Sequence, residues 1–359
     1  MWFDAHLDLA MLAVHGRDML ASADAASTSD YRAGLTLPSL AAGNVRFALG
    51  TIFTEPNGTG PEGYPADNVE RAHAVGRAQL EVYLTWRDRG LISLDRFAAL
   101  RATSGLSQTR AGMGVAESIP LSPASRLARL PKSPSLHVGI LMENADPIRS
   151  PAELAWWKER GVVAVGLCWA SRSRYATGNR CAPGDGGLTT LGKEMVREMD
   201  RLHIIHDCSH LSDASFNDIC LTTDQPIIAS HSNCRAITDP TGQNQRHVTV
   251  AQIKEIARRG GVIGINLFSM FLRPNWTNGT RAAIADCINH IEHICTLTGS
   301  RTHVALGSDM DGGFPADQMP EGINSPADYN LLTDALSEKN WPDPDIQNFT
   351  AGNWLRIFG

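Results

Sequence analysis

The sequence lacks the features that mark several classes of protein. No uninterrupted apolar stretch in its 359 residues is long enough to span a bilayer. The first residues, Met-Trp-Phe-Asp-Ala-His, have neither the basic segment nor the apolar run of a signal peptide. The formal charge of −6 lacks the basic excess that non-specific nucleic-acid binding requires. These absences predict a soluble, cytoplasmic protein that binds neither membranes nor nucleic acid.

The sequence also lacks the cysteine pattern of a disulfide framework. It contains 7 cysteines, an odd number, and no Cys-x-x-Cys pair. Several of them lie within apolar runs, where free cysteine behaves as a small hydrophobic residue. We therefore expect reduced thiols in the core.

The apolar pattern predicts an α/β fold. Helical patterns over residues 66–87, 152–160, 191–202, 250–259 and 282–297 alternate with short apolar runs typical of strands buried on both faces. This alternation predicts one (β/α)8 barrel domain over residues 1–359. A doubly wound open sheet is the alternative, but no Gly-x-Gly-x-x-Gly follows the first strand. The eight predicted strands are residues 3–9, 45–53, 137–142, 162–168, 203–207, 226–230, 262–267 and 304–308.

Two irregular tracts interrupt this alternation, at residues 103–135 and 172–187. The first is rich in Ser, Pro, Gly and Arg, a composition typical of loops. We expect both tracts to be loop excursions that shape a binding pocket, because specificity in barrels resides in the loops after the strands.

Polar residues occur where the predicted strands end. His6 and Asp8 close the first strand as His-Leu-Asp, and residues two apart in an extended chain point to the same face. Glu143 follows a fully apolar strand, where a charge must be solvated, paired or metal-bound. His210 and His231 follow two successive strands, and neutral imidazole is the commonest metal ligand at such positions.

Each of these residues also has a simpler explanation when taken alone. His6 and Asp8 can be solvated polar residues, and Glu143 can form a salt bridge or start a helix. Asp311, in Asp-Gly, is explained by turn formation. His203 and His206 are assigned to the strand itself, one of them as a partner of a ligand.

Taken together, the strand-end residues predict a metal centre. Five ligands are too many for one open tetrahedral site and suit two metal ions that share a carboxylate, and mixed His and carboxylate ligands favour zinc. No strand-end lysine is available as a bridge, so Glu143 is the expected bridge. Asp309, which ends the last strand, is the candidate acid-base residue.

The motifs around these residues resemble those of the membrane (renal) dipeptidase family, the M19 metallopeptidases. They occur in the family order and span nearly the whole chain. They are Asp-Ala-His-Leu-Asp-Leu (4–9), Met-Glu-Asn (142–144), Asp-Cys-Ser-His-Leu-Ser (207–212), Ser-His-Ser-Asn (230–233), Gln-Arg-His (245–247), Gly-Ser-Asp-Met-Asp-Gly (307–312) and Gly-Asn-Trp-Leu-Arg-Ile-Phe (352–358).

The resemblance implies a (β/α)8 barrel with two zinc ions. By its pattern, His6 and Asp8 bind one ion, His210 and His231 bind the other, and Glu143 bridges them. It also implies that Arg246 holds the terminal carboxylate of the substrate, a role that suits the planar guanidinium, and that Asp309 handles the proton. Members of the family are often dimers, so a homodimer is a further implied partner.

Two segments depart from the family pattern. The Gly-Gly-His that follows the bridging glutamate in the family is Asn144-Ala145-Asp146 here. Many members carry a histidine after the fourth strand that polarises the scissile carbonyl, where this chain has Trp169. A tryptophan offers one N–H but cannot titrate, so we expect Trp169 to contact substrate.

The resulting hypothesis is a zinc-dependent dipeptidase, which could also accept a C-terminal D-residue. A hydroxide that bridges the metals attacks the peptide carbonyl, and Asp309 returns the proton to the leaving amine. One alternative is another binuclear metal amidohydrolase, acting on N-acyl amino acids, lactams or lactones. The other is a barrel that binds ligands without turnover.

Overall fold

A computed structural model of the chain describes residues 1–94, 136–239, 241–277 and 279–359. Its main sheet is parallel, in the order β1-β2-β6-β7-β8-β9, with β5 (Ser93–Leu94) paired to the start of β6. The predicted strand of residues 226–230 is only two residues long. The six main strands are β1 (Trp2–Leu7), β2 (Val45–Ile52), β6 (His137–Met142), β7 (Val162–Gly166), β8 (Ile205–Asp207) and β9 (Ile227–Ile228).

A second parallel pair, β10 (Ile263–Ile265) and β11 (Val304–Leu306), continues this arrangement. A bridge between Ala229 and Ile263 connects it to the end of β9. On its other side, the Asp309 N–H donates to the carbonyl of His6 over 3.3 Å. All eight predicted strands are therefore present. They form a curved parallel arrangement in which β10 contacts the end of β9 and the segment after β11 contacts β1. A small separate pair joins β3 (Glu55–Pro56) to β4 (Gly63–Tyr64).

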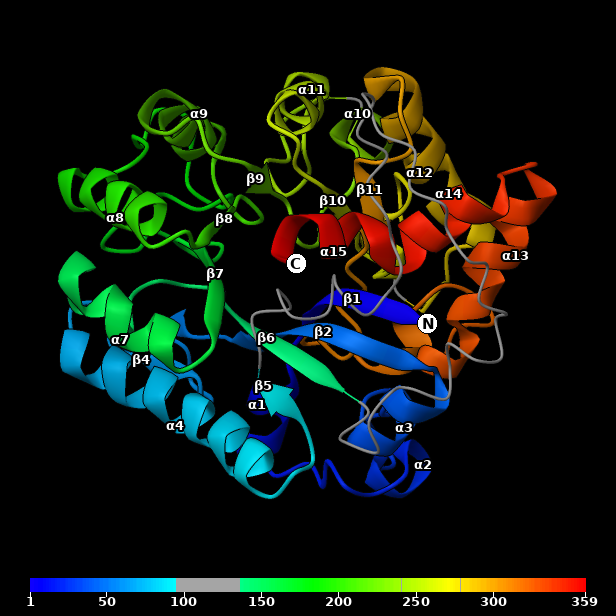
Figure 1. Cartoon of the computed structure of the whole chain (residues 1–359), viewed down its shortest axis with the longest axis horizontal. Coiled ribbons are helices and arrows are strands. Elements are labelled where there is room, and N and C mark those ends of the chain that lie inside the picture. The colour runs from blue at the N-terminus through cyan, green and yellow to red at the C-terminus, as the bar shows by residue number, and fades with distance from the viewer. Residues whose placement is uncertain (95–135, 240, 278) are drawn as a thin grey trace, which may run out of the picture.

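The helices surround the strands (Figure 1). The five predicted helices are present with ends shifted by no more than three residues, and further helices that the sequence did not predict fill the connections. The predicted set is α4 (Val69–Asp88), α7 (Leu154–Glu159) after the turn η1 (Pro151–Glu153), α8 (Thr190–Arg201), α11 (Val250–Arg258) and α12 (Ile284–Thr298). The others are α1 (Leu9–Val14), α2 (Ala23–Ala26), α3 (Leu37–Ala42), α9 (Asp213–Thr222), α10 (Arg235–Thr238), α13 (Asn330–Glu338), α14 (Asp343–Gln347), α15 (Asn353–Phe358) and the short turns η2 (Ser269–Phe271), η3 (Ala316–Gln318), η4 (Pro326–Tyr329) and η5 (Asn348–Gly352).

Side-chain caps set where several helices begin. Thr189 accepts a hydrogen bond from the Gly192 N–H at the start of α8, and Ser212 caps α9 in the same way. Thr249 and Gln252 form a reciprocal capping box at the start of α11. Such caps satisfy N–H groups that the first turn leaves unpaired. They fix each helix start directly after a loop that leaves a strand end.

The C-terminal helix α15 packs at the starts of the strands. There it closes the inner core, the buried cluster that contains Phe3, Ala5 and Trp354. In Figure 1 it lies near the centre of the view, among the strands. Trp354 and Phe358 pack against Phe3, with ring centroids 6.3 and 6.0 Å apart. The Trp354 indole N–H donates to the carbonyl of Leu306 over 2.8 Å. Because α15 occupies this end, the opposite end, where the strands finish, is the one left for a site.

Two sequence predictions concern tracts outside regular structure. Residues 172–187 form neither helix nor strand, as predicted. Residues 103–135 lie outside the described part of the chain.

Within the described residues, no helix combines the length and the apolar character needed to cross a membrane. All seven cysteines are unpaired, in agreement with the expected thiols.

We expect the packing of α15 against the inner core to contribute strongly to the stability of the fold. Leu355, 4% exposed, belongs to the inner core, whereas Leu221 in α9 is 86% exposed. Truncating a buried leucine to alanine removes contacts and leaves a cavity, so Leu355→Ala should lower the free energy of unfolding by about 2–5 kcal/mol. The matched Leu221→Ala should change it by less than about 0.5 kcal/mol. Urea denaturation of both variants measures the difference, and equal effects would show that α15 is not part of the core.

Candidate metal centre

The strand ends bring the five predicted metal ligands into one buried cluster. His6 lies in β1, and Asp8 follows that strand as the residue before α1. Glu143 directly follows β6, and the other two histidines follow β8 and β9. Candidate ligand atoms lie within 4.8 Å of one another in two groups, His6 with Asp8 and Glu143, and Glu143 with His210 and His231.

An irregularity in β1 aims His6 into this cluster. The register of β1 against β2 shifts between Asp4 and Leu7. Phe3 and Ala5 belong to the inner core, whereas Leu7 belongs to the other large buried cluster. In a regular strand these three side chains would all point to the same face, so the strand changes face between Ala5 and Leu7. Such irregularities re-aim side chains next to functional sites.

Glu143 faces both halves of the cluster. Its Oε2 atom is 3.4 Å from His6 Nε2. Its Oε1 atom is 3.0 Å from His210 Nε2 and 3.4 Å from His231 Nε2. Burial acts to raise the pKa of this carboxyl, but the charge of His6 and hydrogen bonds from His210 and His6 hold it well below its usual range. Each oxygen is thus available to a different group of ligands.

The donor set fits divalent metal ions. His6 Nε2 is buried, lies 3.4–3.9 Å from three carboxylates, and has no hydrogen-bond partner within the described residues. The pKa of His210 is lowered to about 4, by burial and by the charge of Arg246, and the pKa of His231 is held well below its usual value, again mainly by burial. Both rings are therefore neutral near pH 7, the form in which imidazole binds zinc.

Asp309 completes a third group, with His6 and His231. Its Oδ1 atom is 3.9 Å from His6 Nε2, and its Oδ2 atom accepts a hydrogen bond from the Asn266 amide over 2.8 Å. Burial and the charges of Asp8 and Glu143 raise its pKa to about 7, although His6 and Arg246 oppose the shift. A carboxyl that titrates near neutrality can both accept and return a proton.

Arg246 is buried beside the cluster with most of its hydrogen-bonding capacity unused. Its Nη1 atom donates to Ser232, the residue after His231, over 3.2 Å. Its Nε and Nη2 atoms have no partner among the described residues. The guanidinium also lies 5.1 Å from the centre of the Phe271 ring. Two unpaired donors on a buried, rigid fork suit a carboxylate ligand.

Comparison with known proteins identifies the family. The sequence profile of the membrane dipeptidase family, peptidase family M19, matches residues 1–359. The chain belongs to the membrane dipeptidase family.

Individual relatives are distant in sequence. A Klebsiella pneumoniae protein, described as an uncharacterized protein in the pqqA 5' region, is 28% identical over 202 residues, which is 55% of this chain and 71% of that protein. Dipeptidase aclJ of Aspergillus oryzae is 32% identical over 214 residues, 58% of this chain and 48% of that protein. The matched part therefore spans about half the length of the fungal enzyme.

The fold likeness covers the whole chain. A metallopeptidase from Rhodobacter sphaeroides, solved with a phosphinate mimic of the dipeptide L-Ala-D-Ala, superimposes with a TM-score of 0.77 at 23% identity. The match covers 99% of this chain and 98% of the other. The two proteins therefore share a fold.

Trp169, the departure from many family members, stands beside the ligands. Its ring is 5.8 Å from that of His210 and meets the Phe53 ring edge-on at 5.2 Å. The guanidinium of Arg180, from the tract of residues 172–187, lies 4.9 Å from the Trp169 ring centre. These side chains form an aromatic wall at one side of the cluster.

The other departure has a structural explanation. Asn144 donates to the carbonyl of Thr54 over 3.0 Å and to the hydroxyl of Tyr64 over 2.8 Å. Asp146 accepts from the Tyr64 hydroxyl over 2.6 Å and from the Arg174 N–H over 2.9 Å. This network joins the segment after β6 to Thr54, to Tyr64 in β4 and to Arg174 in the tract of residues 172–187.

Two histidines require correction. The sequence placed both His203 and His206 in a strand, but His203 is exposed, has a φ of 51° and precedes β8. His206 lies in β8, where its Nε2 atom is 2.7 Å from Asp200 of α8. His206 is thus hydrogen-bonded to a surrounding helix, and among the described residues no hydrogen bond joins either histidine to a ligand.

Sequence reasoning missed the residues that support the ligands. Thr51 donates to Asp8, and Asp207 accepts from the Ser230 hydroxyl over 2.7 Å. Asn266 holds Asp309, as described above. Each lies at or just beyond the end of a strand, and that position was the available signal. Asp311, assigned to a turn, has the left-handed φ of 59° and also accepts from the N–H groups of segment 34–35.

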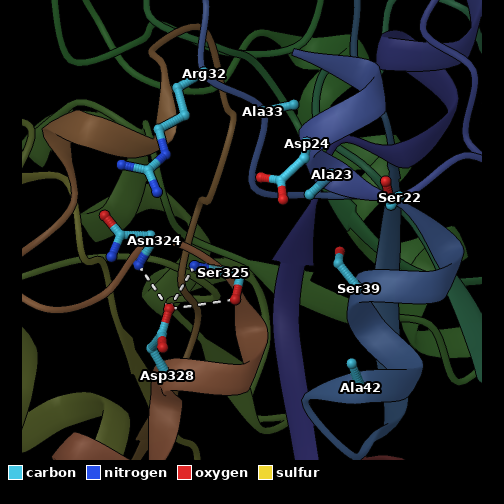
Figure 2. A pocket seen from close by; sticks show the side chains of 10 residues that line it. All are labelled: Ser22, Ala23, Asp24, Arg32, Ala33, Ser39, Ala42, Asn324, Ser325 and Asp328. Carbon is cyan, nitrogen blue, oxygen red and sulfur yellow. Dashed lines mark hydrogen bonds between the residues drawn. The ribbon is translucent and has the colours of Figure 1, made fainter.

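A surface pocket of about 350 Å³ contains none of the predicted site residues. Figure 2 shows Asp24 and Arg32 projecting into it from different segments. Asp328 accepts from the N–H groups of Asn324 and Ser325 and so is engaged in forming η4. The pocket is therefore separate from the metal cluster.

Close backbone approach also builds the centre. A Cβ atom at Gly264 or Gly307 would lie 1.9 or 1.8 Å from the carbonyl oxygen of Ser230. Only glycine at both positions lets β10, the segment after β11 and the residue before His231 pack this closely.

We expect Gly307→Ala to disrupt the centre. The new methyl group must displace the Ser230 backbone, which should cost about 1–3 kcal/mol of stability and weaken zinc binding. Gly166→Ala is the matched control, because its Cβ would find its nearest neighbour at 3.7 Å. Thermal unfolding and zinc content by mass spectrometry measure the two effects. Equal behaviour of both variants would contradict the proposed packing.

Proposed function

We propose that this chain is a zinc-dependent dipeptidase, built as one closed (β/α)8 barrel domain over residues 1–359. The observation that carries the proposal is Arg246, whose two unpaired donors lie in a buried position next to the metal-binding cluster. A dipeptide offers a carboxylate one residue beyond its scissile bond. The fold of the Rhodobacter enzyme, which was solved with a dipeptide mimic, supports the same substrate class.

Two divalent ions would be held by this chain's own ligands. His6 and Asp8 would hold one, His210 and His231 the other, and Glu143 would bind both. Such ions supply Lewis acidity and lower the pKa of water towards about 7. The mixed nitrogen and carboxylate donor set supports zinc.

The remaining residues position the substrate and move its proton. Arg246 binds the free carboxylate through its two unpaired donors. Asp309, held by Asn266, accepts a proton during attack and returns it to the leaving amine. Trp169 lines the pocket beside His210 and contributes apolar contact and one N–H to the substrate.

A second candidate is hydrolysis of N-acyl amino acids. It is favoured by Trp169, which places an apolar ring where many relatives carry histidine. An N-acyl amino acid would present the same carboxylate to Arg246. Cytoplasmic location and a homodimer stay predictions, the first supported by seven unpaired cysteines.

The first experiment measures amine release from L,L and L,D dipeptides by zinc-loaded protein. We expect turnover that chelation abolishes and added zinc restores, because the ligands must be metallated to act. N-acyl amino acids with the same C-terminal residue form the comparison series. Preference for that series would replace the dipeptidase proposal with the second candidate, and no turnover of either would refute both.

Asp309→Asn should separate proton transfer from metal binding. The amide keeps the shape of Asp309 but cannot accept the proton, so kcat should fall by about 10²–10⁴-fold, with zinc content unchanged. Asp218→Asn, in α9 and outside the cluster, is a control for the loss of one carboxylate. Full activity of Asp309→Asn would disprove its role, and loss of zinc would make it a ligand instead.

A further inference from the structure

Ser230 lies behind two of the ligand histidines, on the side away from Glu143. Its hydroxyl donates to Asp207 Oδ2 over 2.7 Å. The same oxygen is 2.8 Å from His231 Nδ1 and 3.4 Å from His6 Nδ1. The His6 and His231 rings stack with their centroids 3.5 Å apart, so one side chain reaches both.

The donors and acceptors of this serine can be counted. A hydroxyl has one proton and two lone pairs. The proton is directed to Asp207, so only lone pairs remain for His6 and His231. Both rings must then carry a proton on Nδ1, so Nε2 is the nitrogen that each ring presents to a metal ion. These are the atoms that lie 3.4 Å from opposite oxygens of Glu143.

The surroundings hold Ser230 in this position. It is fully buried, and its N–H donates to Asp207 Oδ1 over 2.8 Å. Gly264 and Gly307 pack against its carbonyl, as described above. His210 differs, because its Nδ1 atom has no hydrogen-bond partner in the described part of the chain.

We propose that Ser230 is a positioning residue shared by the two metal positions: with Asp207, it fixes the tautomers of His6 and His231 and so prepares one ligand of each ion. The hydroxyl thereby links the two halves of the centre. This inference rests on the two-ion arrangement proposed above. It concerns how the protein prepares its ligands, and it requires no substrate.

Three variants test the proposal. Ser230→Ala removes the hydroxyl, and Ser230→Thr retains it. Ser209→Ala is the matched control, because the Ser209 hydroxyl contacts the His231 N–H at 3.2 Å and Ser230 at 3.3 Å but no imidazole. Zinc is titrated into each metal-free protein in competition with a chromophoric chelator, which resolves the two dissociation constants.

For Ser230→Ala we expect both dissociation constants to rise, each by about 10–100-fold, as is typical when a partner of a metal ligand is lost. Ser230→Thr and Ser209→Ala should stay close to the unmodified protein. If both constants are unchanged in Ser230→Ala, the proposal is wrong. A rise in only one constant also overturns it, because the serine would then serve one histidine alone.

Nitrogen NMR of the metal-free protein with labelled histidine reads the tautomers directly. Two rings should be Nδ1-protonated in the unmodified protein and should lose that preference in Ser230→Ala, whereas His210 should not respond. Unaltered tautomers would refute the proposal. Neither readout involves a peptide, so failure of the dipeptidase assay leaves this test intact.

Asp207→Asn provides a second route if Ser230→Ala does not fold. Asp207 Oδ1 accepts from the N–H groups of Ser209 and Ser230, so the new amide would turn its NH₂ group towards the serine oxygen. In the Ser209→Ala background, which removes the neighbouring hydroxyl at 3.3 Å, the Ser230 proton must then point at one histidine and force that ring into the opposite tautomer. We expect one Nδ1-protonated signal to disappear and zinc affinity to fall at that position. Retention of both signals would overturn the proposal.

Discussion

The centre depends on one buried carboxylate that faces in two directions. Glu143 directs one oxygen at His6 and the other at His210 and His231. A buried carboxylate is costly unless it is paired. Here the pairing partners come from three different strand ends, so the strands must finish at the same level for Glu143 to be satisfied. The ligand geometry therefore constrains the register of the sheet.

The two ends of the strands serve different purposes. At their starts, Trp354, Leu355 and Phe358 of α15 fill the interior with apolar contacts. At their finishes, the interior is replaced by histidines, carboxylates and the hydroxyl and amide groups that hold them. This division lets the apolar end contribute stability while the polar end carries buried groups that are individually unfavourable. Gly264 and Gly307 lie at the transition, where the backbone approaches Ser230.

Much of this arrangement was accessible from the sequence. Eight apolar runs predicted the strands, and polar residues at the ends of four of these runs predicted His6, Asp8, Glu143, His210 and His231 as neighbours. The register shift in β1 was not predictable, because it arises from pairing with β2. The pairing of Ser230 with Asp207 and two imidazoles was missed for a similar reason. A serine is too common for its type alone to indicate a role, and only the packed structure shows which rings it reaches.

The proposed carboxylate-binding role of Arg246 would limit the length of the substrate. Arg246 donates to Ser232, the residue after the ligand His231, and its guanidinium lies over the Phe271 ring. In that role, a substrate would need a free carboxylate within reach of Arg246 when its scissile bond lies at the metal cluster. The aromatic wall of Trp169 and Phe53 lies on the side of His210 and carries no such fixed charge. In the proposed dipeptidase, selectivity should thus be strict for the free carboxylate and permissive for the group on the other side of the scissile bond.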